Sequence, residues 1–287
     1  MSTTPSPGKG RQTKNERRDA AREQARALRE QQLKRDRRNR VLGISMLSVA
    51  VLALVGVGAW LFLQNGSSSD EALPDYPDTP LSEVSDVPST ALPEGGIPVS
   101  ATGVGGTVDD STTRVDVYLD YMCPACGAFE EANGDNLISL AADGSATVVY
   151  HPIAILNRFS NGTGYSTRAA SAAALVADEA PDQFAAFSEQ LFAEQPDEGT
   201  NGLTNAEVAD IARAAGVPDA VADTIADGTA VDRFGQWVTS ATNEVTANPD
   251  LVNEQSGSFG TPTITIDGVI WTENWTDPNA LLQAVGS

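Results

Sequence analysis

Two cysteines, Cys123 and Cys126, are the residues of this sequence best suited to chemistry. An alternating apolar run at 115–119 precedes them and predicts a buried strand. Pro124 follows Cys123, and because proline is favoured at the first helical position, Cys123 is predicted to be the helix N-cap. The free N–H groups and the positive dipole end of that helix would favour the thiolate of Cys123. Cys126, nearly one turn further on, is close enough to form a small disulfide ring with it, so the pattern predicts redox chemistry.

A Cys-x-x-Cys pair can also belong to a zinc site or form a purely structural disulfide. The chain has two cysteines and one histidine, whereas a structural zinc site takes about four such ligands. A zinc site could then form only between molecules. A purely structural disulfide would close a very small ring, which constrains little of the unfolded chain and stabilises weakly. We therefore predict a redox-active pair with no metal and no cofactor.

The charges divide the chain into two unequal parts. Residues 1–40 hold 13 of the 18 Lys and Arg residues, whereas the rest of the chain holds 34 of the 39 acids. Between them, 41–63 is a run of 23 residues without a charge, and about 20 such residues span a bilayer. Basic residues before such a span keep the N-terminus in the cytoplasm. The sequence therefore predicts a single-pass protein of the cell membrane whose acidic part is extracytoplasmic.

A cleaved signal peptide is the alternative interpretation of this segment, with a passable cleavage site at 57–59. However, the apolar run is long for a signal peptide and continues past that site, so we predict an uncleaved anchor held in the lipid bilayer. An extracytoplasmic compartment is oxidising, which permits a persistent disulfide. The strongly acidic remainder argues against a nucleic-acid partner.

The predicted domain organisation has four parts. Residues 64–96 are rich in Ser, Pro and acids and poor in large apolar residues, so we expect a tether without a core. Residues 97–287 are numerous enough for one sizeable core. The parts are a basic cytoplasmic tail (1–40), a transmembrane anchor (41–63), the tether (64–96) and a folded domain (97–287).

Within the folded domain the patterns alternate between strands and helices. Strands are expected at 115–119 and 146–155, on either side of a helix that runs from Pro124 to about residue 142. A helical block is expected at about 160–250, and it includes a capping box at 204–207. The remaining expected elements are strands at 263–266 and 269–272 and a last helix from Pro278. This order, with Cys-x-x-Cys opening the first helix, predicts an α/β protein with a thioredoxin-type fold and an inserted helical block.

The sequence resembles the DsbA-like thiol:disulfide oxidoreductases, and more narrowly the membrane-anchored members from actinobacteria. Three features carry the resemblance, which covers residues 97–287. The first is the run Tyr-Leu-Asp-Tyr-Met-Cys-Pro-Ala-Cys-Gly-Ala-Phe-Glu-Glu at 118–131. The others are Gly-Thr-Pro-Thr at 260–263 and the 135 residues between Cys126 and Pro262. The spacing is far longer than in a minimal thioredoxin.

The resemblance implies roles for the residues around the cysteines. Cys123 is expected to be the nucleophile that exchanges with substrate sulfur, and Cys126 the buried resolving thiol of a Cys123–Cys126 disulfide. Pro262 is expected to follow a cis peptide bond. Thr261 beside it would then offer backbone hydrogen bonds to an extended substrate, as an added strand.

Roles are also expected for other residues in or near the motif. Pro124 and Ala125 are expected to contact substrate, and Ala125 stands where strongly oxidising members often carry histidine. Glu130, four residues after the second cysteine, is either a proton relay, as the resemblance implies, or a solvated charge. Asp120, three residues before the first cysteine, is either a proton acceptor or the end of the strand. His151 is either a structural histidine or a donor to the thiolate.

We therefore expect an extracytoplasmic enzyme that forms disulfides in exported thiol-containing proteins. The resemblance implies that a membrane protein of the vitamin K epoxide reductase-like or DsbB-like type reoxidises it. We expect a monomer. The alternatives are a disulfide reductase or isomerase on the same fold, and a non-catalytic binding protein or holdase with a static disulfide.

Overall fold

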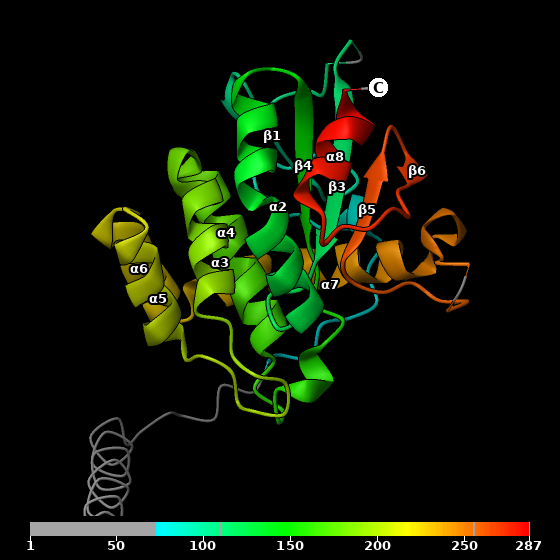
Figure 1. The fold of residues 1–287 in the computed structure, drawn as a ribbon. Coiled ribbons are helices and arrows are strands. Elements are labelled where there is room, and N and C mark those ends of the chain that lie inside the picture. Colours follow the sequence, from blue (N-terminus) through cyan, green and yellow to red (C-terminus); the bar gives the residue numbers. More distant parts are fainter. Residues whose placement is uncertain (1–72, 110, 255, 287) are drawn as a thin grey trace, which may run out of the picture. The chain divides into compact units, whose positions relative to one another are not determined.

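A six-stranded sheet lies at the centre of the fold (Figure 1). The computed structural model describes residues 73–109, 111–254 and 256–286. Strands β3 and β4 are parallel, whereas β5 pairs with β3 and β1 pairs with β4 in antiparallel fashion. In spatial order the strands are β2 (Gly103–Val104), β1 (Ile97–Ser100), β4 (Ala146–Pro152), β3 (Thr113–Leu119), β5 (Thr263–Ile266) and β6 (Val269–Ile270).

Helices cover both faces of the sheet. In Figure 1, α2 (Pro124–Ala142) and α8 (Pro278–Val285) lie in front of the central strands, and α7 (Thr229–Ala247) crosses behind them. All seven residues of β4 are buried, as expected for a parallel strand covered on both faces. Strand β4 ends at Pro152, three residues before the predicted end, where the paired part of the chain stops.

The helical block stands between β4 and β5, as predicted. Its packing depends on large aromatic residues, since Phe184, Phe187, Phe234 and Trp237 are fully buried. Helix α3 is rich in alanine and buried along nearly its whole length. The predicted capping box, at 204–207, is confirmed by both of its reciprocal bonds. The block comprises α3 (Tyr165–Glu179), α4 (Phe184–Ala193), α5 (Asn205–Ala214), α6 (Asp219–Ala226) and α7, with short 3₁₀ turns at η2 (Asn157–Phe159), η3 (Pro181–Gln183) and η4 (Pro249–Leu251). A further 3₁₀ turn, η1 (Leu81–Glu83), precedes β1.

The described part of the predicted tether packs onto the domain. Leu81 is only 4% exposed and belongs to the main apolar core. At Gly95 the chain passes so close to α7 that an added Cβ would lie 3.0 Å from Cβ of Ala241 and 3.2 Å from Leu81 Cδ2. The prediction of a free tether is therefore wrong for residues 73–96.

Polar contacts hold the same segment. The Tyr76 hydroxyl donates to the carbonyl oxygen of Val231 (3.0 Å), and the Ser240 hydroxyl donates to that of Thr79 (2.7 Å). A composition low in apolar residues suggested that this segment could not bury anything. However, one buried leucine and a few hydrogen bonds to α7 are enough to hold the segment against the domain.

The other predicted N-terminal parts lie outside the described residues. These are the basic tail (1–40), the anchor (41–63) and the first part of the tether. Within the ranges that the structure describes, no helix is long and apolar enough to cross a membrane.

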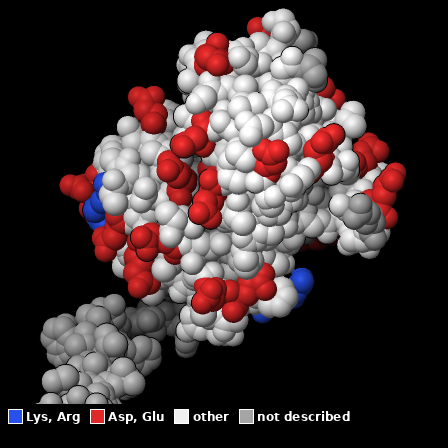
Figure 2. Space-filling model, in the orientation of Figure 1, with Lys and Arg blue, Asp and Glu red and all other residues white. Residues whose placement is uncertain are grey.

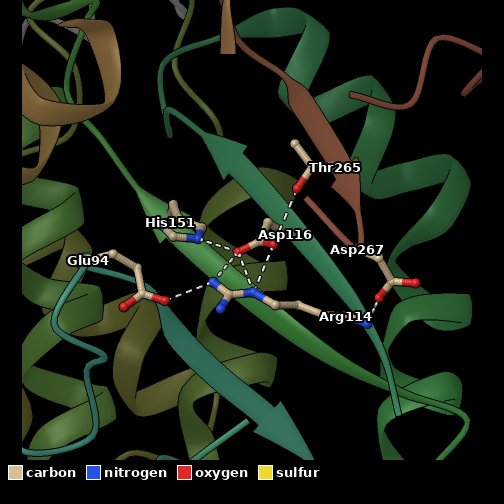
Figure 3. A network of polar contacts seen from close by, with 6 residues as sticks. All are labelled: Glu94, Arg114, Asp116, His151, Thr265 and Asp267. Atoms are coloured by element: carbon tan, nitrogen blue, oxygen red, sulfur yellow. Dashed lines mark hydrogen bonds and ion pairs between the residues drawn. The ribbon is translucent and has the colours of Figure 1, made fainter. Parts of the chain in front are cut away.

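A buried carboxylate ties the central strands together (Figure 3). Asp116 on β3 is 3% exposed and accepts two hydrogen bonds from the Arg114 guanidinium, at 2.9 Å from Nε and 2.6 Å from Nη2. It also accepts from Nε2 of His151 on β4 (2.8 Å) and from the Thr265 hydroxyl on β5 (3.2 Å). Burial by itself raises the pKa of Asp116, but the bonds from His151 and Arg114 outweigh it and hold the pKa below the usual value.

These contacts also bear on the two interpretations of His151. Its ring stacks on Tyr118, with centroids 4.1 Å apart, while its Nε2 bonds to Asp116. Both contacts fix the imidazole within the sheet, which supports the structural interpretation.

The packing of residues 73–96 can be tested by truncating one side chain. Leu81→Ala should lower the free energy of unfolding by about 2–3 kcal/mol, because it removes a buried leucine from the core. Val87→Ala, at an exposed position of the same segment, should change it by less than about 0.5 kcal/mol. Urea unfolding of the two variants measures both effects, and equal small effects would mean that the segment does not pack.

Candidate active site

The cysteines lie at the junction between β3 and α2, as the sequence predicted. Cys123 is the N-cap of α2 and Pro124 is its first residue. The Cys123 N–H donates to the carbonyl oxygen of Asp120 (2.9 Å), and the N–H groups of Cys126 and Gly127 donate to the Cys123 carbonyl (2.9 and 3.1 Å). The turn therefore places the Cys123 side chain at the positive, N-terminal end of α2, without a capping hydrogen bond to its sulfur.

Both cysteines are free thiols in this structure, and their acidities differ strongly. The pKa of Cys123 is lowered to about 6, first because the Cys126 thiol donates a hydrogen bond to its sulfur. Burial opposes this shift, whereas the Thr261 hydroxyl and the N–H groups of Cys126 and Ala125 add to it. Burial and the neighbouring Cys123 sulfur raise the pKa of Cys126 well above its usual value. At neutral pH the pair therefore holds one thiolate, on Cys123.

The loop before β5 lies opposite Cys123. The Thr261–Pro262 peptide bond is cis, as predicted. The Cys123 sulfur is 3.3 Å from the carbonyl oxygen of Thr261, which accepts a hydrogen bond from the protonated thiol. As a thiolate, the same sulfur is stabilised by the Thr261 hydroxyl. Thr261 and Pro262 are both partly exposed beside it, while Cys123 itself is 6% and Cys126 1% exposed.

Asp120 lies fully buried directly before the cysteine turn. One carboxylate oxygen accepts from the Met122 N–H (2.9 Å) and the other accepts from the Leu156 N–H (2.9 Å). Burial raises the pKa of Asp120 to about 6, and the two backbone bonds lower it only in part. Asp120 therefore joins the cysteine turn to the chain after β4, and its raised pKa also permits it to exchange a proton near neutral pH.

Glu130 is not a solvated helix charge. It is 6% exposed, and its Oε2 is buried without a hydrogen bond from any residue that the structure describes. Burial raises its pKa to about 7, and the carboxylates of Glu189 and Asp135 add to this shift. A carboxyl group with this pKa can hold or release a proton at neutral pH.

One contributor to the site was not expected from the sequence. The Gln195 side-chain amide donates to the carbonyl oxygens of Tyr121 and Cys123, both at 3.0 Å. It reaches them over Gly127, where an added Cβ would lie 2.6 Å from the Gln195 Oε1. Gln195 follows α4 and is 69 positions beyond Cys126, so no local pattern could connect it with the cysteines. The glycine after the second cysteine is the only local trace of this contact.

Two grooves border the site. A groove of about 1150 Å³ extends from Pro262 along β5 and β6 and is lined by Trp271 and Trp275; we call it the tryptophan groove. A second groove, of about 730 Å³, begins at Pro124 and lies between α2 and α4. We call the second one the acidic groove, since its lining includes Glu130, Glu131, Asp135 and Glu189.

The structure therefore brings most of the predicted site together. Cys123, Cys126, Thr261 and Pro262 form one cluster, with Asp120 beneath it and the exposed Pro124 and half-buried Ala125 at its surface. Glu130 lies further along α2, in the acidic groove. His151 belongs to the network around Asp116.

Comparison with known proteins agrees with this geometry. A family model described as Thioredoxin matches residues 107–284. Among curated proteins, the serine/threonine-protein kinase PknE of Mycobacterium tuberculosis is 30% identical over 187 residues, which are 64% of this chain and 31% of that protein. The chain thus spans about a third of the length of the curated relatives that it matches.

Solved structures give the finer comparison. Oxidised DsbA from Mycobacterium tuberculosis is 29% identical, with a TM-score of 0.53 over 66% of this chain and 90% of that one. Reduced DsbG from the same organism is 29% identical, with a TM-score of 0.53 over 68% and 88%. MdbA from Actinomyces oris, at 21% identity and a TM-score of 0.55 over 73% and 97%, shares the fold. The chain therefore belongs to the thioredoxin family, and among solved structures it is similar to the DsbA-type thiol:disulfide oxidoreductases.

Proposed function

We propose that this protein forms disulfides in exported proteins by exchange through Cys123 and Cys126. The observation that carries the proposal is the position of Cys123 at the start of α2, 3.3 Å from the Thr261 carbonyl oxygen before the cis bond to Pro262. The acidity of the pair supports it, since the pKa of Cys123 is lowered to about 6 and that of Cys126 is raised well above its usual value. A stabilised Cys123 thiolate favours the reduced enzyme, which makes its disulfide a better oxidant. It also makes Cys123 a good leaving group.

The exchange proceeds in two steps. A substrate thiolate attacks the Cys123 sulfur of the oxidised enzyme, forming a mixed disulfide and releasing Cys126 as a thiolate that takes up a proton. A second substrate thiolate then attacks the substrate sulfur of the mixed disulfide, forming the product disulfide and releasing Cys123 as a thiolate. Two electrons pass from the substrate dithiol to the enzyme. Thr261 and Pro262 border the Cys123 sulfur, where an extended substrate would lie.

We also propose a membrane location for this protein and a membrane protein that reoxidises it. The uncharged run at 41–63, with basic residues before it, supports a membrane anchor and an extracytoplasmic domain. Each turnover leaves the enzyme reduced, so a second protein must accept its electrons. A membrane protein of the vitamin K epoxide reductase-like or DsbB-like type would supply this step, and a monomeric enzyme would suffice for it.

The acidity of the two cysteines can be tested by alkylation. In the reduced protein, the rate of reaction of Cys123 with iodoacetamide should rise with pH around pH 6 and then level off, because only the thiolate reacts. Cys126 should stay unreactive until far higher pH. Mass spectrometry of the labelled peptides separates the two rates, and a Cys123 rate that rises only around its ordinary pKa of about 8.5 would contradict the assignment.

The direction of exchange can be tested by the reduction potential in glutathione buffers. We expect a value between the roughly −270 mV of thioredoxin and the roughly −120 mV of DsbA, since Ala125 supplies no donor to the thiolate where strong oxidants often carry histidine. A value at or below that of thioredoxin would favour the reductase. A disulfide that never equilibrates with glutathione, together with unchanged activity in Cys123→Ser, would favour the non-catalytic binding protein or holdase.

The membrane proposal has its own test. The full chain should stay in the membrane pellet after alkaline carbonate extraction. A protease added to cells without their wall should remove the folded domain and leave an epitope placed in residues 1–40 intact. Release of the full chain by carbonate, or digestion of the epitope, would contradict the proposed anchor and orientation.

A further inference from the structure

The acidic groove collects negative charge beside the reactive cysteine. Glu130, Glu131 and Asp135 on α2 face Glu189 on α4 across a space of about 730 Å³. Figure 2 shows acidic side chains spread over this face of the molecule, with Lys and Arg confined to its margins. An acidic cluster is commonly only a solvated surface. The burial and the hydrogen bonds of the individual carboxylates decide whether it is a binding site.

One of these carboxylates is buried without a partner. Glu130 is 6% exposed and lines the groove, and its Oε2 accepts no hydrogen bond from any described residue. Its Oε1 lies over Gly134, where an added Cβ would be 3.0 Å away. Because a buried carboxylate that lacks a partner is costly, this one is a binding position for a hydrogen-bond donor or a cation.

The folded domain has no spare cation to fill this position. Residues 41–287 contain five arginines and no lysine. Arg114 is bound to Asp116 and Glu94, Arg233 to Asp178 and Glu179, and Arg213 to acids of α5 and α6. Arg158 lies over the Phe159 ring, and Arg168 donates to Leu203 and Asn205. A cation in the groove would therefore come from outside residues 41–287, and we take it to belong to the substrate.

The acidic groove also begins next to the reactive cysteine. It begins at Pro124, which follows Cys123, and Glu130 is six residues further along α2, or about 9 Å at 1.5 Å per residue. That distance corresponds to about three residues of extended peptide. We propose that the acidic groove binds the basic side chain of a substrate residue about three positions from the cysteine that reacts with Cys123. This inference rests on the proposed disulfide exchange and adds a preferred class of substrate to it.

The protonation of Glu130 gives the proposal a pH signature. Burial raises the pKa of Glu130 to about 7, and Glu189 and Asp135 add to the shift. Tyr121 and Tyr150 also face it, but burial raises their own pKa values, so they stay neutral in this range. A cation should therefore be preferred more strongly at about pH 8, where Glu130 is charged, than at about pH 6.

The test compares two dithiol peptides that differ only in charge. One carries Arg three residues from a cysteine and the other carries citrulline, which has the same shape without the charge. With the full chain, kept oxidised by excess glutathione disulfide, kcat/KM should be about tenfold higher for the Arg peptide, mostly through KM, as for one charge-assisted hydrogen bond. The ratio of the two kcat/KM values should increase from about pH 6 to about pH 8, and taking the ratio cancels any pH effect on the enzyme that the two peptides share.

Matched variants locate the effect. Glu130→Gln should bring the ratio close to one, whereas Glu244→Gln on α7, an exposed residue outside the groove, should leave it unchanged. A fall in kcat for both peptides with an unchanged ratio would assign Glu130 to proton transfer and overturn the proposal. Equal turnover of the two peptides by the unmodified chain would overturn this inference alone. No turnover of either peptide would overturn the proposed function together with it.

Discussion

The start of α2 directly after Cys123 is the constraint on which the reactivity of this site depends. With Pro124 as its first residue, the helix places the Cys123 sulfur at its positive end and the Cys126 thiol one turn further on, within hydrogen-bonding reach of that sulfur. Two side chains hold this turn, because Asp120 accepts from backbone N–H groups before and after it in the chain and Gln195 donates to the carbonyl oxygens of Tyr121 and Cys123. A loss of either support would move the N–H groups relative to the sulfur, so both are positioning residues for the nucleophile.

The two buried carboxylates Asp116 and Glu130 show how partners decide the effect of burial. Both lose most of their water. Asp116 has donors from Arg114, His151 and Thr265, and its pKa is lowered. Glu130 faces other acids, and its pKa is raised. The first carboxylate therefore joins three strands as a permanent anion, whereas the second stays unsatisfied until a proton or a cation arrives.

The sequence predicted the features that depend on neighbours along the chain. The strand before Cys123, the N-cap with Pro124 and the capping box at 204–207 each follow from adjacent residue types, and the structure contains all of them. Contacts between distant segments were not predictable in this way. Leu81 was predicted to lie in a tether, because its burial depends on contacts near Gly95 and Ala241, which are distant in the sequence. Asp116 is an exception, because a charged residue within a buried strand requires a partner, and the sequence alone could therefore have predicted a polar network there.

The inserted helical block has a further role besides extending the core. Helix α4 forms the far wall of the acidic groove with Glu189, and Gln195 just after it reaches the cysteine turn. A minimal thioredoxin fold lacks this block and hence both contributions. On the other side of Cys123, the tryptophan groove offers aromatic surface beside Pro262. Because α4 and Gln195 belong to the insertion, the insertion shapes one of the two grooves that border Cys123.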